Sequence, residues 1–171
     1  DKHSKLESFA EHSMVPVINA LSDRFHPCQL LADMQTFTEK KGSISGKSVA
    51  WIGDGNNVCQ SYINASNIFN FELRIGCPKG FEPERELLSE NADRVFLAEN
   101  PVMAARGADL VVTDVWASMG QEKEQAERAN AFEDFQVTAE LMSYASKGAA
   151  FMHCLPAHRG EEVTTDVLDA N

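Results

Sequence analysis

Short apolar runs alternate with amphipathic segments along most of this 171-residue chain. The apolar runs have the length of buried strands, and the segments between them have the apolar spacing of helices. Strands that alternate with helices predict a parallel sheet, because each helix returns the chain to the start of the next strand. We therefore predict an α/β fold: a doubly wound, mainly parallel sheet with helices on both faces, in the three layers of a Rossmann-like domain.

Gly, Pro and helix-capping residues mark where the individual strands and helices begin and end. The expected strands cover 15–18, 48–52, 73–76, 95–97, 109–114 and 149–152. The expected helices cover 4–13, 27–40, 58–69, 84–91, 101–106, 121–135, 138–145 and a short stretch near 163–169.

Charge and cysteine content exclude several classes of partner. The formal net charge is −11, which repels nucleic acid and anionic lipid because phosphate binding needs clusters of Lys and Arg. No apolar run approaches the roughly 20 residues that cross a membrane, and the opening residues lack a signal-peptide pattern. The four cysteines form no C-x-x-C pair or zinc-type spacing, so we expect reduced thiols, a cytoplasmic protein and no metal.

Reactive side chains are densest where the expected strands end. The strand over 149–152 runs into His153-Cys154-Leu155-Pro156, and Asp114 stands at the tip of the strand over 109–114. Ser118 and Gly120 follow in a loop that can approach a ligand. Open α/β sheets bind ligands outside the carboxyl ends of their strands. We therefore expect a ligand site here, and an anionic Asp114 suits a ligand ammonium.

The turn Gly53-Asp54-Gly55-Asn56-Asn57 follows a strand and opens a helix. Glycines allow close approach of a ligand, and free N–H groups at a helix start suit a carboxylate or phosphate. A dinucleotide fingerprint needs Gly or Ala where Val58 stands, so that motif is incomplete. A small-ligand site and a simple tight turn both remain open. Asn57 is the best candidate for ligand contact, and Asn56 is a candidate helix cap.

For two further candidate sites, at the start of the helix over 27–40 and at Cys154, a purely structural role is the alternative to a role in ligand binding or catalysis. His26 precedes a helix and can donate to a carbonyl oxygen, and Gln29 one turn later offers a donor and an acceptor. A His before Pro is also common as a cap or a packed ring. Cys154 is a nucleophile if an imidazole or a helix dipole stabilises its thiolate, and otherwise an inert buried thiol.

Three of these motifs occur together in one order: His26-Pro27-Cys28-Gln29, the run from Asp114 to Gly120, and His153-Cys154-Leu155-Pro156. That set resembles the ornithine carbamoyltransferase family over nearly the whole chain. The resemblance implies two α/β domains in the parent, which is a trimer or a multiple of one. It implies that residues 1–171 are the ornithine-binding second domain. The carbamoyl phosphate motif Ser-Thr-Arg-Thr and the family's C-terminal helix do not occur here, so we expect no activity from these residues alone.

The resemblance also assigns roles for a reaction that needs no cofactor. His26 would donate to the carbonyl oxygen of carbamoyl phosphate, Gln29 would hold the carbamoyl amide, and Cys154 and Leu155 would accept from that amide through backbone carbonyls. Residues that would grip ornithine are Asn57, Asp114, Ser118 and Met119. The product would be citrulline, formed by direct attack through a tetrahedral intermediate. Alternatives are a carbamoyltransferase for putrescine or acetylornithine, a nucleotide-binding module, and a non-catalytic amino-acid-binding module.

Overall fold

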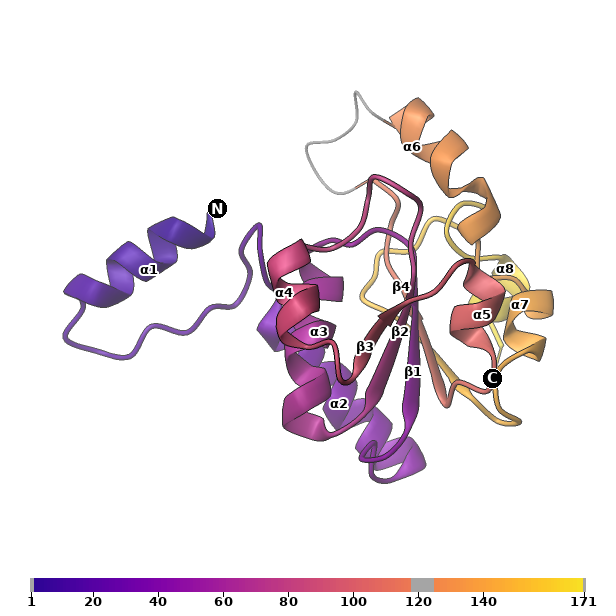
Figure 1. The fold of residues 1–171 in the computed structure, drawn as a ribbon, viewed down its shortest axis with the longest axis horizontal. Helices are drawn as coiled ribbons and strands as arrows, with labels where there is room; N and C mark the ends of the chain where they lie inside the picture. The colour runs from indigo at the N-terminus through magenta and orange to yellow at the C-terminus, as the bar shows by residue number, and fades with distance from the viewer. Residues whose placement is uncertain (1, 118–124, 171) are drawn as a thin grey trace.

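The centre of the molecule is a five-stranded parallel sheet. The computed structural model describes residues 2–117 and 125–170, and Figure 1 shows their arrangement. The strands are β1 (Ser48–Ile52), β2 (Glu72–Gly76), β3 (Val95–Leu97), β4 (Leu110–Thr113) and β5 (Ala150–His153). Their order across the sheet is β3-β2-β1-β4-β5, and each neighbouring pair is parallel. The α/β prediction is confirmed. The chain reverses its direction of winding between β1 and β4, which is where such sheets bind ligands.

Helices cover both faces of the sheet. In Figure 1, α2, α3 and α4 lie on one side of the strands, and α5, α7 and α8 lie on the other. The helices are α1 (His3–His12), α2 (Pro27–Lys41), α3 (Asn57–Phe69), α4 (Arg85–Glu90), α5 (Pro101–Ala105), α6 (Gln125–Phe132), α7 (Ala139–Ser143) and α8 (Thr165–Leu168). A short 3-10 turn, Glu133–Phe135, continues α6. Among the described helices, none combines the length and the apolarity that a membrane span needs.

Strand β1 shows why the sheet needs cover on both faces. Val49 and Trp51 belong to the core under α2 and α3, whereas Ala50 and Ile52 belong to the core under α5 and α7. Side chains alternate between the two faces of a strand, so a strand that is apolar throughout must be buried on both. This central burial fixes where β1 ends, and therefore where the turn from Gly53 to Asn57 begins.

Two expectations about strands are wrong. Residues 15–18 form no strand, because this segment lies apart from the sheet edge and has no partner for its backbone. The strand over 149–152 exists as β5, but it is an edge strand and is half-buried rather than buried. Of the helix expected over 121–135, the described part is helical. The portion at 121–124 lies outside the described residues.

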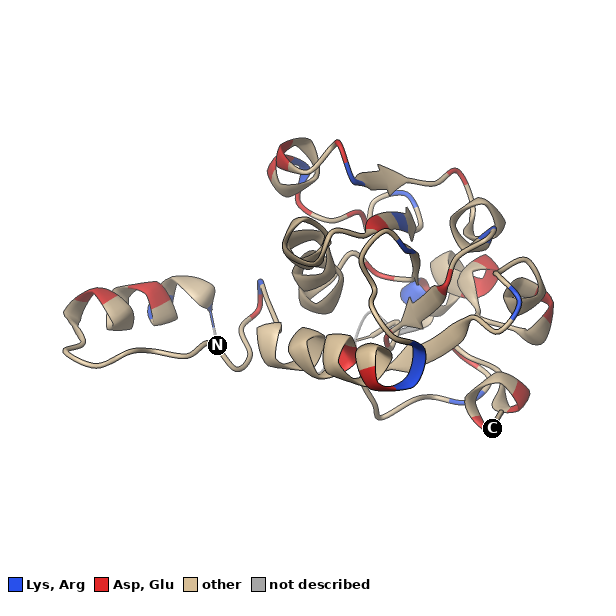
Figure 2. Cartoon of the chain, turned by 90° about the horizontal axis from the view of Figure 1, so that it is seen from below, with Lys and Arg blue, Asp and Glu red and all other residues tan. Residues whose placement is uncertain are grey.

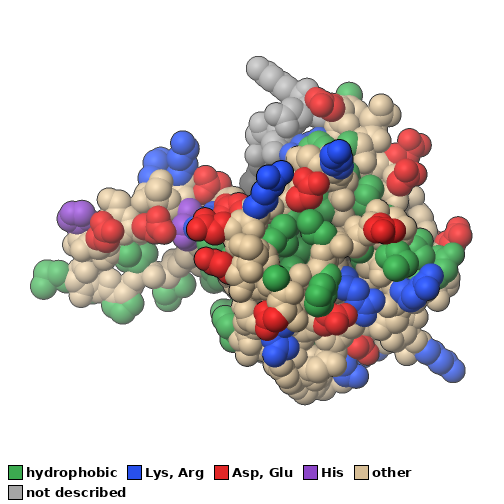
Figure 3. Space-filling model, viewed as in Figure 1, with side chains coloured by type: hydrophobic (Ala, Val, Ile, Leu, Met, Phe, Trp, Pro, Cys, Tyr) green, Lys and Arg blue, Asp and Glu red, His purple; other side chains and the backbone are tan. Residues whose placement is uncertain are grey.

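The N-terminal segment projects from the body. Helix α1 lies beside the domain in Figure 1, and its described polar contacts to the body run from His3 to Ser22 and Asp23. Figure 3 shows apolar side chains gathered on this projection. They include Phe9, Met14, Val15 and Ile18, of which Met14 is 101% exposed. By contrast, Figure 2 shows Asp and Glu residues spread over helices and loops around the sheet, in line with the net charge of −11.

Candidate active site

Asp114 is the centre of a hydrogen-bonded group at the carboxyl end of the sheet. It directly follows β4 and is 7% exposed. Its Oδ1 accepts from the backbone N–H of Val115 over 2.7 Å and from the thiol of Cys154 over 2.9 Å. Its Oδ2 accepts from Nδ2 of Asn56 over 2.7 Å. We call Asn56, Asp114 and Cys154 the strand-tip group, because they follow β1, β4 and β5 respectively.

Cys154 is held as a neutral thiol. Burial, followed by the charge of Asp114 and the hydrogen bond to it, raises the pKa of Cys154 well above its ordinary value. A thiol with a raised pKa carries its proton at neutral pH and is a poor nucleophile. Within this structure Cys154 therefore acts as a hydrogen-bond donor to Asp114. Among the described residues, no cation stabilises a Cys154 thiolate, so the thiolate alternative lacks support there.

Asn56 contributes more than the helix cap expected from the sequence. Its Oδ1 accepts from the backbone N–H groups of Val58 and Cys59, which caps α3. Its Nδ2 is then free to donate to Asp114. One amide side chain thus fixes the start of α3 and orients the carboxylate. The sequence analysis chose Asn57 for ligand contact and gave Asn56 only the role of a helix cap. The cap uses the oxygen of the Asn56 amide, and the contact of its nitrogen with Asp114 was missed.

Asn57 lies one position further along and is directed elsewhere. Its Nδ2 donates to the backbone carbonyl of Ser22 over 2.8 Å, which ties the start of α3 to the segment before α2. Its role in gripping a ligand stays a prediction, and it requires the amide to leave Ser22 or to use its oxygen.

The glycines of this turn make room for the protein itself. A Cβ on Gly55 would overlap the backbone nitrogen of Pro83 and would lie 2.6 Å from the carbonyl oxygen of Phe81. Gly55 N–H also donates to that carbonyl over 2.8 Å. Gly53 has a φ of +135°, which favours glycine. Gly55 therefore fits the prediction of a simple tight turn, because the loop that contains Phe81 and Pro83 occupies the space that a ligand would need.

A second group lies at the start of α2. His26 is the residue before the helix, and its backbone N–H donates to Oγ of Ser61 over 2.7 Å. Its Nδ1 is buried and has no hydrogen-bond partner among the described residues. One turn later, Nε2 of Gln29 donates to Oδ1 of Asp33 over 2.9 Å. We call His26, Gln29 and Asp33 the helix-start group.

Asp33 was missed by the sequence analysis. It is 8% exposed, and its Oδ2 accepts from the hydroxyl of Tyr62 on α3 over 2.7 Å. Burial raises the pKa of Asp33, although the hydrogen bonds from Tyr62 and Gln29 and the proximity of His26 oppose the shift. The available signal was the four-residue spacing from Gln29, which places both side chains on one face of a helix.

The two groups are neighbours in space. The charge of Asp33 is among the influences that raise the pKa of Cys154, and Cys154 packs against the same apolar core as Tyr62. Helices α2 and α3 pack against each other, and this packing holds the two groups close together. His26, Gln29, Asp114 and Cys154, which were predicted from distant parts of the sequence, are thus brought to one region.

The loop after β5 is fixed by two hydrogen bonds of the buried His153 side chain. Nδ1 of His153 accepts from the backbone N–H of Leu155 over 2.9 Å, so the proton of the neutral ring is on Nε2. Nε2 then donates to Oε1 of Glu162 over 2.9 Å, with both side chains almost completely buried. Leu155 has a φ of +53° and a side chain that is largely exposed. Among the described residues, no hydrogen bond uses the carbonyl oxygens of Cys154 or Leu155.

The other end of the site is held by Asp54 and Arg128. Nη1 of Arg128, on α6, donates to Oδ2 of Asp54 over 2.8 Å and to the carbonyl of Trp116 over 2.8 Å. Its guanidinium lies 4.9 Å from the ring centre of Phe81. Burial raises the pKa of Asp54, and Arg128 opposes that shift. This anchor fixes Trp116 next to the strand-tip group. The predicted ligand residues Ser118 and Met119 lie outside the described residues.

Potential metal ligands meet at two places in the described chain. Ligand atoms of Asp114, His153 and Cys154 lie within 4.8 Å of one another, as do those of His158, Glu161 and Glu162. Both ring nitrogens of His153 are already engaged by Leu155 and Glu162. Metal binding at the first cluster would therefore break an existing bond and deprotonate Cys154. The first cluster shares Asp114 and Cys154 with the strand-tip group, and the second lies in the segment after β5.

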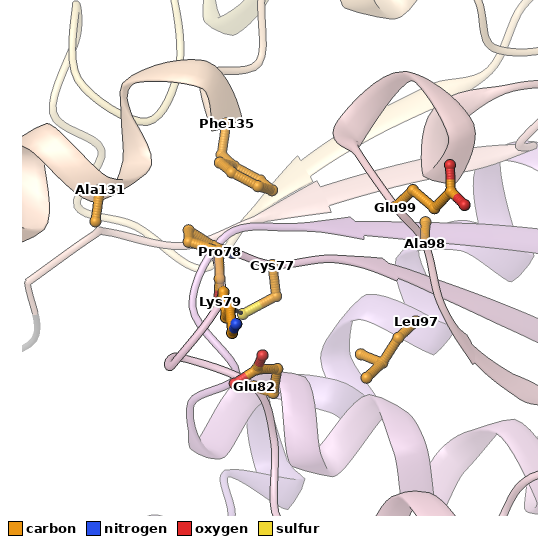
Figure 4. A pocket seen from close by; sticks show the side chains of 9 residues that line it. All are labelled: Cys77, Pro78, Lys79, Glu82, Leu97, Ala98, Glu99, Ala131 and Phe135. Carbon is orange, nitrogen blue, oxygen red and sulfur yellow. Dashed lines mark hydrogen bonds between the residues drawn. The ribbon is translucent and has the colours of Figure 1, made fainter.

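A hollow of about 440 Å³ lies apart from both groups. Figure 4 shows it beyond the carboxyl ends of β2 and β3, with Phe135 on one side and Leu97 on the other. Lys79, Glu82 and Glu99 stand at its rim, and the thiol of Cys77 faces Phe81 O at 2.8 Å. It contains none of the residues predicted for ligand binding.

Comparison with known proteins places this geometry in a family. Residues 45–171 match the aspartate/ornithine carbamoyltransferase Asp/Orn binding domain, and residues 1–39 match the carbamoyl-P binding domain of the same family. The helix-start group therefore falls in the second match and the strand-tip group in the first. The expectation that residues 1–171 form one ornithine-binding domain stays a prediction, and these matches favour a boundary near residue 40.

Similar proteins carry the same family name. The chain is 62% identical to the ornithine carbamoyltransferase of Methylococcus capsulatus over 98% of this chain and 56% of that protein. It is 58% identical to an anabolic ornithine carbamoyltransferase of Pseudomonas aeruginosa, of which it covers 55%. The chain spans about half the length of these curated relatives.

Solved structures agree with the sequence matches. An anabolic ornithine carbamoyltransferase from Campylobacter jejuni superposes with a TM-score of 0.93 at 37% identity, covering 99% of this chain and 58% of that one. The enzyme from Pyrococcus furiosus gives 0.91 at 46% identity, covering 99% and 56%. On the match over residues 45–171, the chain belongs to the aspartate/ornithine carbamoyltransferase family.

Proposed function

We propose that this chain supplies the ornithine site and part of the carbamoyl phosphate site of an ornithine carbamoyltransferase. The reaction transfers the carbamoyl group of carbamoyl phosphate to the δ-amine of L-ornithine and gives L-citrulline and phosphate. The observation that carries the proposal is the buried Asp114 carboxylate, oriented by Asn56 and Cys154 at the carboxyl ends of the strands. The names of the similar proteins support the choice of ornithine.

The strand-tip group fits the amino-acid end of ornithine. Asp114 carries a negative charge in a largely buried place, where its attraction for an α-ammonium is weakly screened. Its three donors hold the carboxylate in one orientation before the ligand arrives. Asn57, Ser118 and Met119 complete the grip in this proposal.

The helix-start group and the loop after β5 fit the carbamoyl group. In this proposal His26 donates to the carbonyl oxygen, on which negative charge grows as the amine attacks. Gln29 and the backbone carbonyls of Cys154 and Leu155 take the amide hydrogens of the carbamoyl group. These carbonyls have no other partner among the described residues, which leaves them available.

The attacking amine has to be neutral, yet a free alkylamine resembles Lys and titrates near 10.4. The neutral thiol of Cys154 offers the amine neither a negative charge nor a base. We therefore propose that removal from water, rather than proton transfer to a thiolate, lowers the pKa of the bound amine.

The decisive experiment is citrulline formation by the full-length protein that contains this chain. Carbamoyl phosphate is supplied with L-ornithine, putrescine or N-acetylornithine, and phosphate release is measured in parallel. We expect turnover with L-ornithine far above turnover with the other two amines, because they lack a free α-ammonium for Asp114. Preference for either competitor, or phosphate release without citrulline, would overturn the proposal.

The 171 residues alone provide a second test. They contain no Ser-Thr-Arg-Thr segment, so we expect no citrulline from them. We expect calorimetry to detect L-ornithine binding, since the strand-tip group is complete without that segment. Citrulline formation by the 171 residues would contradict the assignment of the carbamoyl phosphate site. The full-length protein is further proposed to be a cytoplasmic trimer or a multiple of one, and the four cysteines of these 171 residues are unpaired in this structure.

A further inference from the structure

Gln29 is proposed to hold the carbamoyl amide, yet an amide side chain presents either an acceptor or a donor, depending on which way it is turned. Helix position alone does not decide between these orientations. In this structure Nε2 of Gln29 faces Oδ1 of Asp33 at 2.9 Å, one helical turn away. The orientation of Gln29 is therefore linked to the chemistry of Asp33.

An ionised carboxylate accepts hydrogen bonds and donates none. Asp33 thus forces the NH₂ end of Gln29 toward itself and leaves the amide oxygen directed away from it. The carboxylate is itself held, because Asp33 is buried on α2 and Tyr62 of α3 donates to its second oxygen over 2.7 Å. Each carboxylate oxygen has one donor, so the arrangement has a single hydrogen-bonding solution.

We propose that Asp33 is a positioning residue that fixes the amide of Gln29 with its oxygen toward the substrate. The inference rests on the proposed function and deepens it. A carbamoyl group ends in NH₂, so it needs an acceptor at this place. With the amide of Gln29 reversed, two NH₂ groups would face each other, and the hydrogen bond would be replaced by a repulsive contact.

The same helix carries a matched control. Nε2 of Gln35 donates to Oε1 of Glu39 over 2.9 Å with the same spacing, but this pair is exposed on α2. Glu39→Gln makes the same carboxylate-to-amide change in an exposed pair on the same helix and leaves the site intact. An effect of helix stability alone would appear in both variants.

The test is steady-state kinetics on the full-length protein with Asp33→Asn, Gln29→Ala and the double variant. Asn at position 33 presents both NH₂ and oxygen, so it no longer selects the orientation of Gln29. We expect the KM for carbamoyl phosphate to rise about tenfold with Asp33→Asn, as for the loss of one hydrogen bond, while kcat changes little. Glu39→Gln should leave both constants unchanged.

The double variant separates positioning from a structural role. If Asp33 acts through Gln29, Asp33→Asn adds nothing to the KM of Gln29→Ala, because contacting residues are not additive. Equal effects of Asp33→Asn in both backgrounds would overturn the inference, as would an unchanged KM in the single variant. Citrulline formation by the parent protein reports on the proposed function separately.

Tyr62→Phe keeps the proposal testable if Asp33→Asn fails to fold. It removes one of the two anchors of the Asp33 carboxylate and keeps its charge and its bond to Gln29. We expect a rise of about threefold in the KM for carbamoyl phosphate, absent in the Gln29→Ala background. The same rise in both backgrounds would overturn the inference.

Discussion

The strand-tip group and the helix-start group differ in how far their hydrogen bonds are completed. The Asp114 carboxylate has three donors, and Asn56 and Cys154 each use a side chain to supply one. In the helix-start group, Nδ1 of His26 is buried without a described partner, and Gln29 is held by one end of its amide. In the strand-tip group, residues of this chain supply hydrogen bonds to both oxygens of the carboxylate. In the helix-start group, His26 and Gln29 each have a polar atom without a described partner.

The difference follows the two family matches. The strand-tip group lies within residues 45–171, and the helix-start group lies within residues 1–39. A complete carboxylate site is suited to bind a cationic ligand on its own. An incomplete group is suited to a ligand that brings the missing partners. Under the proposed function, this difference separates a pre-formed site for ornithine from a carbamoyl phosphate site that needs further groups.

The largest expected effect comes from Asp114→Ala. It removes the charge that we propose binds the α-ammonium, and it leaves Asn56 and Cys154 without their acceptor. Breaking a buried ion pair from one side costs about 4 kcal/mol, so kcat/KM for ornithine should fall about a thousandfold in the full-length protein. The KM for carbamoyl phosphate should change far less.

A surface carboxylate provides the control for that variant. Asp169 pairs with Arg159 over 2.8 Å, and both side chains are more than half exposed. Asp169→Ala should leave kcat/KM for ornithine and the KM for carbamoyl phosphate unchanged, because exposed ion pairs contribute little to stability. Equal losses toward both substrates in Asp114→Ala would erase the proposed division between the groups.

An intermediate effect is expected from the chemistry of Cys154. Its raised pKa keeps it a thiol, so alkylation by iodoacetamide at pH 7–8 should be slow and should accelerate in strongly alkaline solution. Exposed Cys28 provides the internal comparison, and mass spectrometry of the 171 residues measures both. Modification of Cys154 before Cys28 at neutral pH would show that a thiolate is present and that the strand-tip group is not a neutral-thiol site.

The smallest effect concerns the pH dependence of stability. Burial raises the pKa of Asp33 above its ordinary 3.8, so the folded state binds a proton more tightly than the unfolded state. This contribution lowers the free energy of unfolding as pH rises from about 4 through the folded-state pKa. Asp33→Asn removes the titration, so the variant should gain stability relative to the parent sequence over that window. Urea unfolding between pH 4 and 7 measures this, and parallel curves would contradict the shifted pKa of Asp33.

Much of the fold was predictable because local pattern and tertiary structure agree. Continuous apolar runs mark β1 and β4, since central parallel strands are buried on both faces. Residues 15–18 are also apolar, but Pro16 cannot donate to a strand ladder, and the segment has no partner strand. The half-burial of β5 was missed for a related reason, because the order of strands across a sheet is not encoded in any one run.

The site was predictable where a strand end carries a charged or reactive side chain. Asp114 and Cys154 were chosen in this way, and the structure brings them into contact, while their roles in binding stay predictions. Three residues with supporting contacts were missed: Asn56, Asp33 and Glu162. Each holds another side chain in place, and contacts of this kind are visible only in the folded structure. Such contacts depend on where α3 packs against α2 and where the loop after β5 folds back.

The sequence by itself determined the alternation of strands and helices, the acidic surface and the motifs that place the chain beside carbamoyltransferases. These depend on residue types and on spacings within one element, which a linear pattern records. The tertiary structure decided that Cys154 is a thiol bound to Asp114, that Gly55 makes room for Phe81 and Pro83, and that Asp33 orients Gln29. Protonation and side-chain orientation follow from burial and from partners on other elements, and folding alone brings those partners together.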